Sequence, residues 1–214
     1  MADPRDPPFG VRVLPETVSA TDCADWVACL ARQPHEPVQI IDHQKSTPAQ
    51  VAYRRDPSRV TERVDPGPIR QAIEDVIRSA VTTQISQDCG RDFAWFIGPQ
   101  VLRYNPGGFY KRHADSDHWS AEHSAWVKGL DRDISLLIYL NDDFSRGELN
   151  FPHFNYLYRP CAGDLIFFPS DFRYLHQALP VESGTRYVIA SWAAFAGEPR
   201  VRDKRPDNRI DLDY

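Results

Sequence analysis

The chain has 214 residues, of which 42% are hydrophobic and 26% are charged, and its formal net charge is −5. This length and composition are typical of one globular domain with an adequate core. The negative charge argues against a nucleic acid as the partner, and the lack of any run of about 18 apolar residues argues against a membrane span.

The cysteines point to a reducing environment. They show no CxxC pair and no spacing typical of metal ligands. We therefore expect reduced thiols, mostly buried, in a cytoplasmic protein. The N-terminal stretch "MADPRDPPFG" lacks the apolar core of a signal peptide, which agrees with this location. The four residues are Cys23, Cys29, Cys89 and Cys161.

Two helices are predicted in the N-terminal part. The first covers residues 18–33, with Ser19 or Thr21 as its N-cap and apolar residues along one face. The second begins after the Pro66-Gly67-Pro68 stretch and continues to about residue 86, because isoleucine and valine recur at helical spacing. These spaced residues are Ile69, Ile73, Ile77 and Val81.

From residue 93 onward the pattern changes to short aromatic or β-branched segments separated by Gly, Pro, Asn and Asp. Strands are expected at 93–104, 108–115, 133–141, 147–152, 156–160, 164–169, 174–181 and 185–195. Eight strands without intervening helices predict an all-β core with flanking helices, namely a jelly roll (double-stranded β-helix) preceded by N-terminal helices. We expect one domain over 1–214, made of a helical and lid region (1–92), a catalytic core (93–196) and a charged C-terminal extension (197–214).

The stretch "YNPGGFYKRHADSDHW", residues 104–119, holds more potential metal ligands than one site needs. On a strand, residues i and i+2 face the same side, so His113 and Asp115 can act together. Asp117 and His118 are adjacent and would face opposite ways, so we expect Asp117 to cap a loop and His118 to lie at the rim or simply in a loop. Two histidines and one carboxylate form the facial triad of non-haem Fe(II) oxygenases, and His176 is the best candidate for the third ligand.

A cation is expected deep in the same core. Arg186 lies ten residues after His176, in the next predicted strand, and its planar fork suits a carboxylate better than lysine does. In that strand Arg186, Val188, Ala190 and Trp192 share one face.

Taken in order, these motifs resemble the 2-oxoglutarate/Fe(II)-dependent dioxygenases, in particular the prolyl 4-hydroxylase type. The resemblance covers residues 93–195, with HxD, "YLN", "GEL.FP", "GDLIFF" and then a histidine followed by an arginine ten residues later. Many prolyl 4-hydroxylases carry lysine where this chain has Arg186, which leaves the subfamily open.

The resemblance implies roles for individual residues. His113, Asp115 and His176 would be the catalytic iron ligands. Arg186 would pair with the distal carboxylate of 2-oxoglutarate, Tyr139 would donate its hydroxyl to the same group, Tyr104 would line the co-substrate pocket, and Trp192 would form part of its wall. Tyr104, Tyr139 and Trp192 can also be read as ordinary core residues.

The resemblance also implies an activity. Fe(II), 2-oxoglutarate and O2 would be required, with ascorbate as a supporting reductant, and the reaction would yield succinate and CO2. The substrate would be a prolyl residue, a free amino acid or a related small molecule, hydroxylated at an unactivated C–H bond. Asp115 favours hydroxylation because related halogenases lack this carboxylate. Trp192 occupies the position at which nucleic-acid demethylases carry a second arginine, which argues against nucleic acid.

The alternative is a jelly-roll metal-binding or sugar-binding module without oxygenase activity, which would have no need of Arg186. The sequence makes no prediction of the oligomeric state. Two segments are candidates for a lid over the site, residues 42–65 and 116–133. Within them, Arg54 and Arg55 could meet a substrate carboxylate or be plain exposed charges, and Trp119 and Trp126 could stack on a proline ring or an apolar chain.

Overall fold

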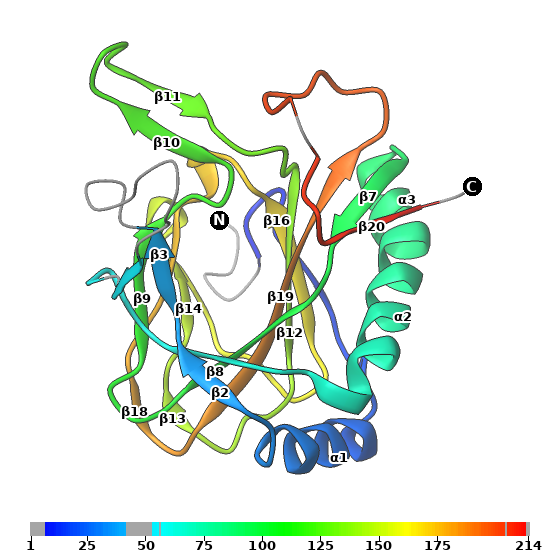
Figure 1. Cartoon of the computed structure of the whole chain (residues 1–214), viewed down its shortest axis with the longest axis vertical. Coiled ribbons are helices and arrows are strands. Elements are labelled where there is room, and N and C mark those ends of the chain that lie inside the picture. Colours follow the sequence, from blue (N-terminus) through cyan, green and yellow to red (C-terminus); the bar gives the residue numbers. More distant parts are fainter. Residues whose placement is uncertain (1–6, 42–52, 56, 204, 213–214) are drawn as a thin grey trace.

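Two antiparallel sheets face each other, and helices cover the outer side of the larger one (Figure 1). The computed structural model describes residues 7–41, 53–55, 57–203 and 205–212. The larger sheet runs in the order β1-β16-β12-β19-β8-β6-β2, with β7 paired to β19 and β20 paired to β7. Its strands are β1 (Arg12–Leu14), β2 (His35–Pro37), β6 (Glu62–Val64), β7 (Phe93–Ile97), β8 (Gln100–Tyr104), β12 (Ile134–Tyr139), β16 (Leu165–Pro169), β19 (Arg186–Phe195) and β20 (Arg209–Asp211).

The smaller sheet runs in the order β15-β14-β17-β9-β5. Its strands are β5 (Arg59–Val60), β9 (Phe109–His113), β14 (Leu149–Phe151), β15 (Tyr156–Tyr158) and β17 (His176–Ala178). Three further strand pairs lie outside the two sheets: β3 (Gln39–Ile41) with β4 (Tyr53–Arg55), β10 (Asp117–Ser120) with β11 (Ala125–Lys128), and β13 (Ser145–Arg146) with β18 (Val181–Ser183). This is the predicted jelly roll with flanking helices.

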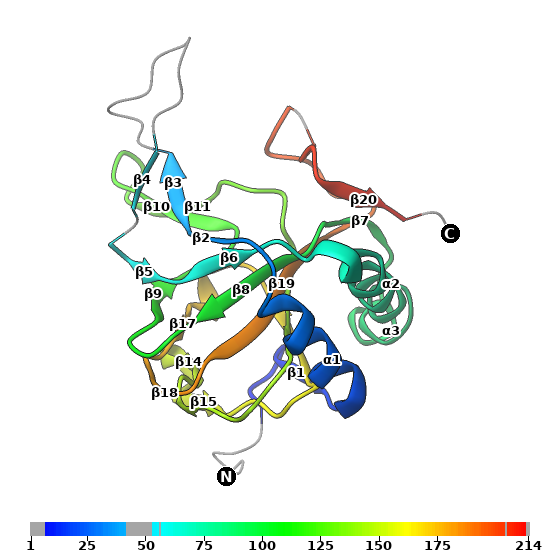
Figure 2. The ribbon, with the colours of Figure 1, turned by 60° about the horizontal axis from the view of Figure 1, so that its bottom comes forward.

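The helices form at the predicted places. They are α1 (Ala20–Leu30), α2 (Arg70–Ala80), a π-helical turn (Val81–Ile85) and α3 (Ser86–Cys89). Ser19 is the N-cap of α1, since its hydroxyl oxygen accepts a hydrogen bond from the Asp22 backbone N–H at 3.1 Å. Figure 2 shows the helices together on the side of the molecule away from β10 and β11.

The larger sheet separates two cores. Its outer face packs against the helices, with Ile77 of α2 and Ile189 of β19 among the buried residues. Its inner face looks toward the smaller sheet, with Phe151 and Val188 among the buried residues there. Because successive residues of a strand point to opposite faces, β19 contributes alternate side chains to each core.

The structure differs from the sequence prediction in four places. The expected strand 93–104 is two strands, β7 and β8, which break at Gly98-Pro99 because proline cannot donate to a ladder. The region 116–133, expected as an insert, contains the β10–β11 hairpin, which projects from the body in Figure 1. The N-terminal region adds β1, β2 and β6 to the larger sheet, and the charged C-terminal segment adds β20.

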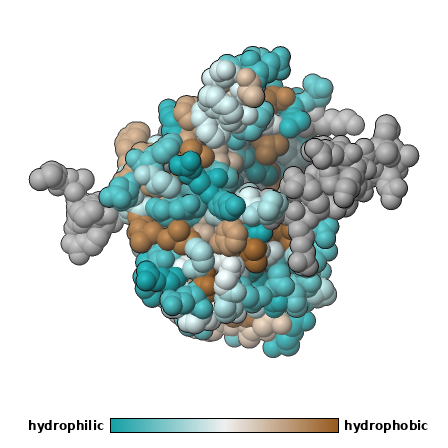
Figure 3. Space-filling model, turned by 90° about the vertical axis from the view of Figure 1, so that its left-hand side faces the viewer, coloured by the Kyte–Doolittle hydropathy of each residue, from teal (hydrophilic) through white to brown (hydrophobic). Residues whose placement is uncertain are grey.

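The cysteines are free thiols, as expected, but only Cys23 is buried. Cys161 is exposed, so the prediction that the cysteines are mostly buried is wrong. Cys161 lies at the turn before β16, where the chain passes over the surface. The face in Figure 3 is mainly hydrophilic, with hydrophobic residues in a broken band across its middle.

Candidate functional site

Two histidines meet because their strands are neighbours in the smaller sheet. His113 is the last residue of β9, and His176 is the first residue of β17. The two are register partners in the antiparallel pairing of these strands, and their ring centroids are 4.3 Å apart. Residues directly opposite in such a pair lie on the same face, so a separation of 63 positions in the chain becomes a direct contact.

The backbone fixes the orientation of both imidazoles. The Nδ1 atom of His113 lies 2.9 Å from the Lys111 carbonyl oxygen, and the Nδ1 atom of His176 lies 3.1 Å from the Tyr174 carbonyl oxygen. A carbonyl oxygen can only accept, so each Nδ1 carries the proton. Each Nε2 therefore keeps its lone pair, which is the arrangement found in metal-binding histidines.

Asp115 is positioned by hydrogen bonds rather than by strand geometry. β9 ends at His113, so the expectation that His113 and Asp115 share a strand is wrong, although the two side chains do meet. The backbone N–H of Asp115 donates to the Ser170 carbonyl at 3.1 Å. The Ser135 hydroxyl donates to Asp115 Oδ2 at 2.7 Å and lies 2.8 Å from the Ser170 hydroxyl.

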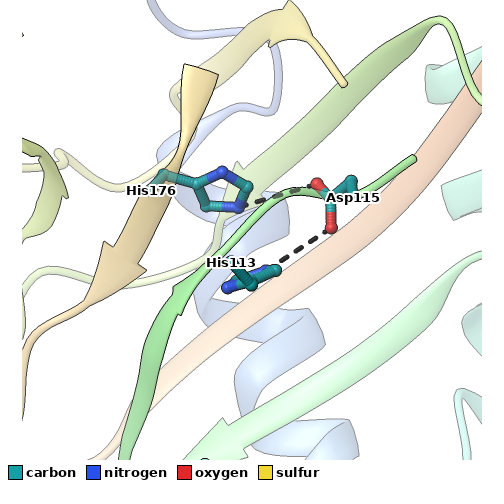
Figure 4. A group of neighbouring side chains, drawn as sticks. All are labelled: His113, Asp115 and His176. Carbon is teal, nitrogen blue, oxygen red and sulfur yellow. Dashed lines mark ion pairs between the residues drawn. The ribbon is translucent and has the colours of Figure 1, made fainter. Parts of the chain in front are cut away.

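The three side chains converge on one point (Figure 4). The Nε2 atom of His113 lies 3.4 Å from Asp115 Oδ1, and that of His176 lies 3.6 Å from Asp115 Oδ2. One donor atom from each residue lies within 4.8 Å of the others. Among the described residues, this is the one group of His, Cys, Asp and Glu side chains close enough to hold a metal ion.

The protonation states suit a cation. Burial, together with the neighbouring His113, lowers the pKa of His176 to about 4, so the His176 imidazole is neutral near pH 7. Burial alone would raise the pKa of Asp115, but His176, His113 and Arg132 around it outweigh burial and hold that pKa below its usual range. Two imidazoles and one carboxylate fit Fe(II) and leave part of its coordination sphere open.

Arg186 begins β19 and faces the same interior. It is 1% exposed, and its register partner on β8 is Tyr104. The guanidinium carbon lies 3.9 Å from the centre of the Tyr104 ring, and Nη1 donates to the Gly147 carbonyl. Its Nε is buried without a hydrogen-bond partner among the described residues, which leaves a donor free for a ligand.

A cavity joins these residues. His113, Asp115, His176 and Arg186 line it, together with Tyr104, Tyr139, Trp192 and apolar residues such as Val188 and Ala190. Burial raises the pKa of Tyr139, so its hydroxyl stays protonated and able to donate. The residues that the sequence assigns to the iron and to 2-oxoglutarate therefore all line this one cavity.

The buried polar atoms without a partner in the described part of the chain gather here. Among the described residues, buried side-chain nitrogens without a partner belong to Arg59, Arg186 and Trp192, and all three residues line the cavity. Such atoms are rare in folded proteins because each one costs free energy. Their concentration in one cavity indicates that a polar ligand completes the site.

Sequence reasoning missed three residues around the cavity. Ser135 holds Asp115, Arg132 places its guanidinium carbon 3.8 Å from the centre of the Trp192 ring, and Arg59 lines the cavity from β5. Each lies far in the chain from the motif residue that it contacts. A serine or arginine without a local motif gives no signal in a single sequence.

The alternative candidates lie outside the triad. Asp117 starts β10 and accepts a hydrogen bond from the Phe172 backbone N–H at 3.1 Å, and His118 is exposed. Trp119 is 56% exposed on the hairpin, and Trp126 stacks on Phe172 with ring centroids 5.7 Å apart. The side chains of Arg54 and Arg55, and residues 42–52 of the expected lid, lie outside the described part of the chain.

Comparisons with known proteins agree with this geometry. The sequence profile of the 2OG-Fe(II) oxygenase superfamily matches residues 99–194. A candidate prolyl 4-hydroxylase of Acanthamoeba polyphaga mimivirus is 36% identical over 103 residues, which are 44% of this chain and 43% of that protein. The match therefore spans less than half of the length of this relative.

Prolyl 4-hydroxylase 1 of Arabidopsis thaliana is 27% identical over 201 residues, which are 84% of this chain and 67% of that protein. Among solved structures, the viral collagen prolyl hydroxylase of Paramecium Bursaria Chlorella virus-1, in complex with 2-oxoglutarate, has the same fold. The TM-score is 0.59 at 19% identity, over 86% of this chain and 96% of that one.

No helix in the described part of the chain has both the length and the apolar character that a membrane span needs. The interior of the jelly roll, which holds the triad and Arg186, coincides with the region that the superfamily profile matches. Over residues 99–194, the sequence of the chain is thus similar to the 2OG-Fe(II) oxygenase superfamily.

Proposed function

We propose that this protein is an Fe(II)- and 2-oxoglutarate-dependent dioxygenase that hydroxylates an unactivated C–H bond. The observation that carries the proposal is the shared cavity of His113, Asp115, His176 and Arg186. The overall change would be substrate C–H, O2 and 2-oxoglutarate giving substrate C–OH, succinate and CO2. The alternative, a jelly-roll binding module, gives no reason for a buried arginine with a free donor in this cavity.

The triad would hold the iron through His113 Nε2, His176 Nε2 and an Asp115 oxygen. When bound, Fe(II) and 2-oxoglutarate supply the activation of O2, which is chemistry that side chains alone lack. The carbonyl oxygens of Lys111 and Tyr174 keep the two imidazoles in the required tautomer. The hydroxyl of Ser135 keeps the carboxylate turned toward them.

The co-substrate would be bound by the opposite part of the cavity. Arg186 would pair with the distal carboxylate, and the neutral hydroxyl of Tyr139 would donate to the same group. Tyr104 would line this end, beneath the Arg186 guanidinium. Trp192, with a free Nε1 donor, and the apolar side chains of Val188 and Ala190 would form the wall and exclude water.

For the substrate we propose a prolyl residue, a free amino acid or a related small molecule. The named relatives are prolyl hydroxylases, which supports a prolyl substrate in a peptide. The exposed Trp119 beside Trp126 offers an aromatic surface on which a proline ring could stack. The four free thiols are consistent with the cytoplasmic location expected from the sequence.

The test is turnover by the purified protein with Fe(II), ascorbate and 2-oxoglutarate. We expect 2-oxoglutarate to bind only with the metal present, and succinate to form together with a product that has gained one oxygen by mass spectrometry. The variant His113→Ala should abolish iron-dependent succinate formation, whereas His118→Ala, which removes an exposed histidine of the same segment, should not. A wild-type protein that neither binds 2-oxoglutarate nor forms succinate would sink the proposal.

A further inference from the structure

Arg59 lies on β5, the edge strand beside the strand that carries His113. In this pairing Arg59 is the register partner of Tyr110. Its guanidinium carbon lies 4.3 Å from the centre of the Tyr110 ring, and the Tyr110 ring stacks on His113 with 3.7 Å between centroids. One aromatic ring therefore separates Arg59 from a proposed iron ligand.

The free donors of Arg59 have a defined shape. Its Nε and Nη2 atoms are buried and have no hydrogen-bond partner among the described residues. These two nitrogens lie along one edge of the guanidinium, where their N–H groups point the same way. Such an edge matches the two oxygens of a carboxylate in a bidentate pair.

The charges of the cavity leave Arg59 without compensation. Asp115 is the one carboxylate among the described residues that line the cavity, and it belongs to the triad. Fe(II) and 2-oxoglutarate carry two positive and two negative charges, so together they are neutral. With Asp115 balancing Arg186, the positive charge of Arg59 remains, and its buried Nε and Nη2 atoms have no hydrogen-bond partner among the described residues, which is costly.

We infer that Arg59 binds a carboxylate of the substrate that is hydroxylated. This inference rests on the proposed function and narrows its substrate class to molecules that carry a carboxylate close to the reacting carbon. Arg59 also lines a second pocket, so the two pockets share this residue. A substrate that reaches from the second pocket into the cavity would meet Arg59 beside the iron site.

A role for Arg59 in binding the co-substrate is less suitable. Arg186 already offers a buried free donor in the larger sheet, whereas Arg59 stands on the smaller sheet over the Tyr110 ring. The other arginine near the triad, Arg132, donates to the Asp115 carbonyl at 3.2 Å and covers Trp192. Arg59 is therefore the arginine that remains for a ligand other than Fe(II) and 2-oxoglutarate, namely the substrate.

The experiment measures binding without turnover. The protein, loaded with Fe(II) and 2-oxoglutarate under nitrogen, is titrated by calorimetry with paired probes that differ only in one carboxylate. One arm uses free amino acids, including L-proline, against their amides. The other arm uses acetylated proline-containing dipeptide amides with glutamate against glutamine. In one of the two arms, we expect the probes with the carboxylate to bind about 10- to 100-fold more tightly than the matching amides. The reason is that hydrogen bonds to charged groups are strong.

Variants assign the preference to Arg59. Arg59→Gln should remove the difference between acid and amide, and Arg59→Lys should keep part of it, since lysine keeps the charge but loses the fork. Arg63→Gln is the matched control, because Arg63 is an exposed arginine on the adjoining β6 that pairs with Glu36. Its acid preference should equal that of the wild type.

Three outcomes would overturn the inference. They are a wild type that binds no acid more tightly than its amide, an Arg59→Gln variant that keeps the full preference, and an Arg59→Gln variant that weakens the binding of 2-oxoglutarate instead. In each case the proposed function would still stand, provided that the wild type binds 2-oxoglutarate. Failure of the wild type to bind 2-oxoglutarate at all would instead count against the function itself.

Discussion

Strand β19 faces two interiors that are built differently. On one side, Ile189 and Ala193 pack against the helical layer in a core of apolar side chains. On the other side, Arg186 and Trp192 line a cavity and hold buried nitrogens without partners. Residues one position apart in the same strand therefore belong to two environments.

The two faces of β19 therefore contribute to different properties: the outer face to stability, and the inner face to ligand binding. Apolar burial on the outer face stabilises the fold and needs no ligand. Unpaired donors on the inner face cost free energy in the empty protein, and a ligand that pairs with them recovers it. A substitution on one face should therefore change one property and leave the other.

The largest effect that we expect on the inner face is on co-substrate binding. Arg186→Gln should weaken 2-oxoglutarate binding about 30-fold or more, because truncating a buried charged partner costs about 2–5 kcal/mol. Arg186→Lys keeps the charge and should lose less. Calorimetry with Fe(II) under nitrogen measures both dissociation constants, and an unchanged value for Arg186→Gln would contradict the assignment.

A substitution on the outer face should lower the stability of the fold and leave 2-oxoglutarate binding unchanged. Ile77 is fully buried between α2 and the sheet. Ile77→Ala should lower the free energy of unfolding by about 2–5 kcal/mol, because it removes packed methyl groups and leaves a cavity. The dissociation constant of 2-oxoglutarate, measured where the variant is still folded, should stay at the wild-type value.

The control for that substitution lies on the same helix. Gln71 is exposed on α2, so Gln71→Ala should change the free energy of unfolding by no more than about 0.5 kcal/mol. Chemical denaturation measures both variants. A weaker 2-oxoglutarate affinity in Ile77→Ala would show that the two faces are coupled.

The sequence predicts the outer face more completely than the inner one. The spacing of Ile73, Ile77 and Val81 reveals a buried helix face, because a helix repeats within a few residues. The alternation along β19 likewise separates Arg186 from Ile189. These patterns are local, so one sequence is enough to detect them.

The inner face depends on contacts between distant segments. His113 and Asp115 could be paired from their spacing, and His176 could be chosen as the candidate for the third ligand. The detail that fixes Asp115, namely Ser135 and Ser170, is invisible because β12 and β16 approach it only in the folded chain. Arg59 was missed for the same reason, since β5 and β9 pair although about 50 residues of chain separate them.

A smaller effect is expected from a residue that only holds a proposed metal ligand in place. Ser135→Ala removes the hydroxyl that donates to Asp115, and we expect Fe(II) affinity to fall about 10- to 100-fold. Ser191→Ala is the matched control, because Ser191 is equally buried but donates to the Ile97 carbonyl, away from the triad. Metal titration should separate the two variants, and equal losses would mean that Ser135 acts only through the fold.

The smallest effect should come from the cap of α1, at the edge of the outer core. Ser19→Ala removes the acceptor for the Asp22 backbone N–H and should cost about 1 kcal/mol of unfolding free energy. Thr21, the other N-cap candidate in the sequence, is exposed within the first turn of α1, so Thr21→Ala should change stability by no more than about 0.5 kcal/mol. Neither change should alter the affinity for Fe(II), because α1 packs on the outer face and contributes no residue to the cavity. If denaturation gave equal losses for the two variants, the hydrogen bond of Ser19 would not be what stabilises the start of this helix.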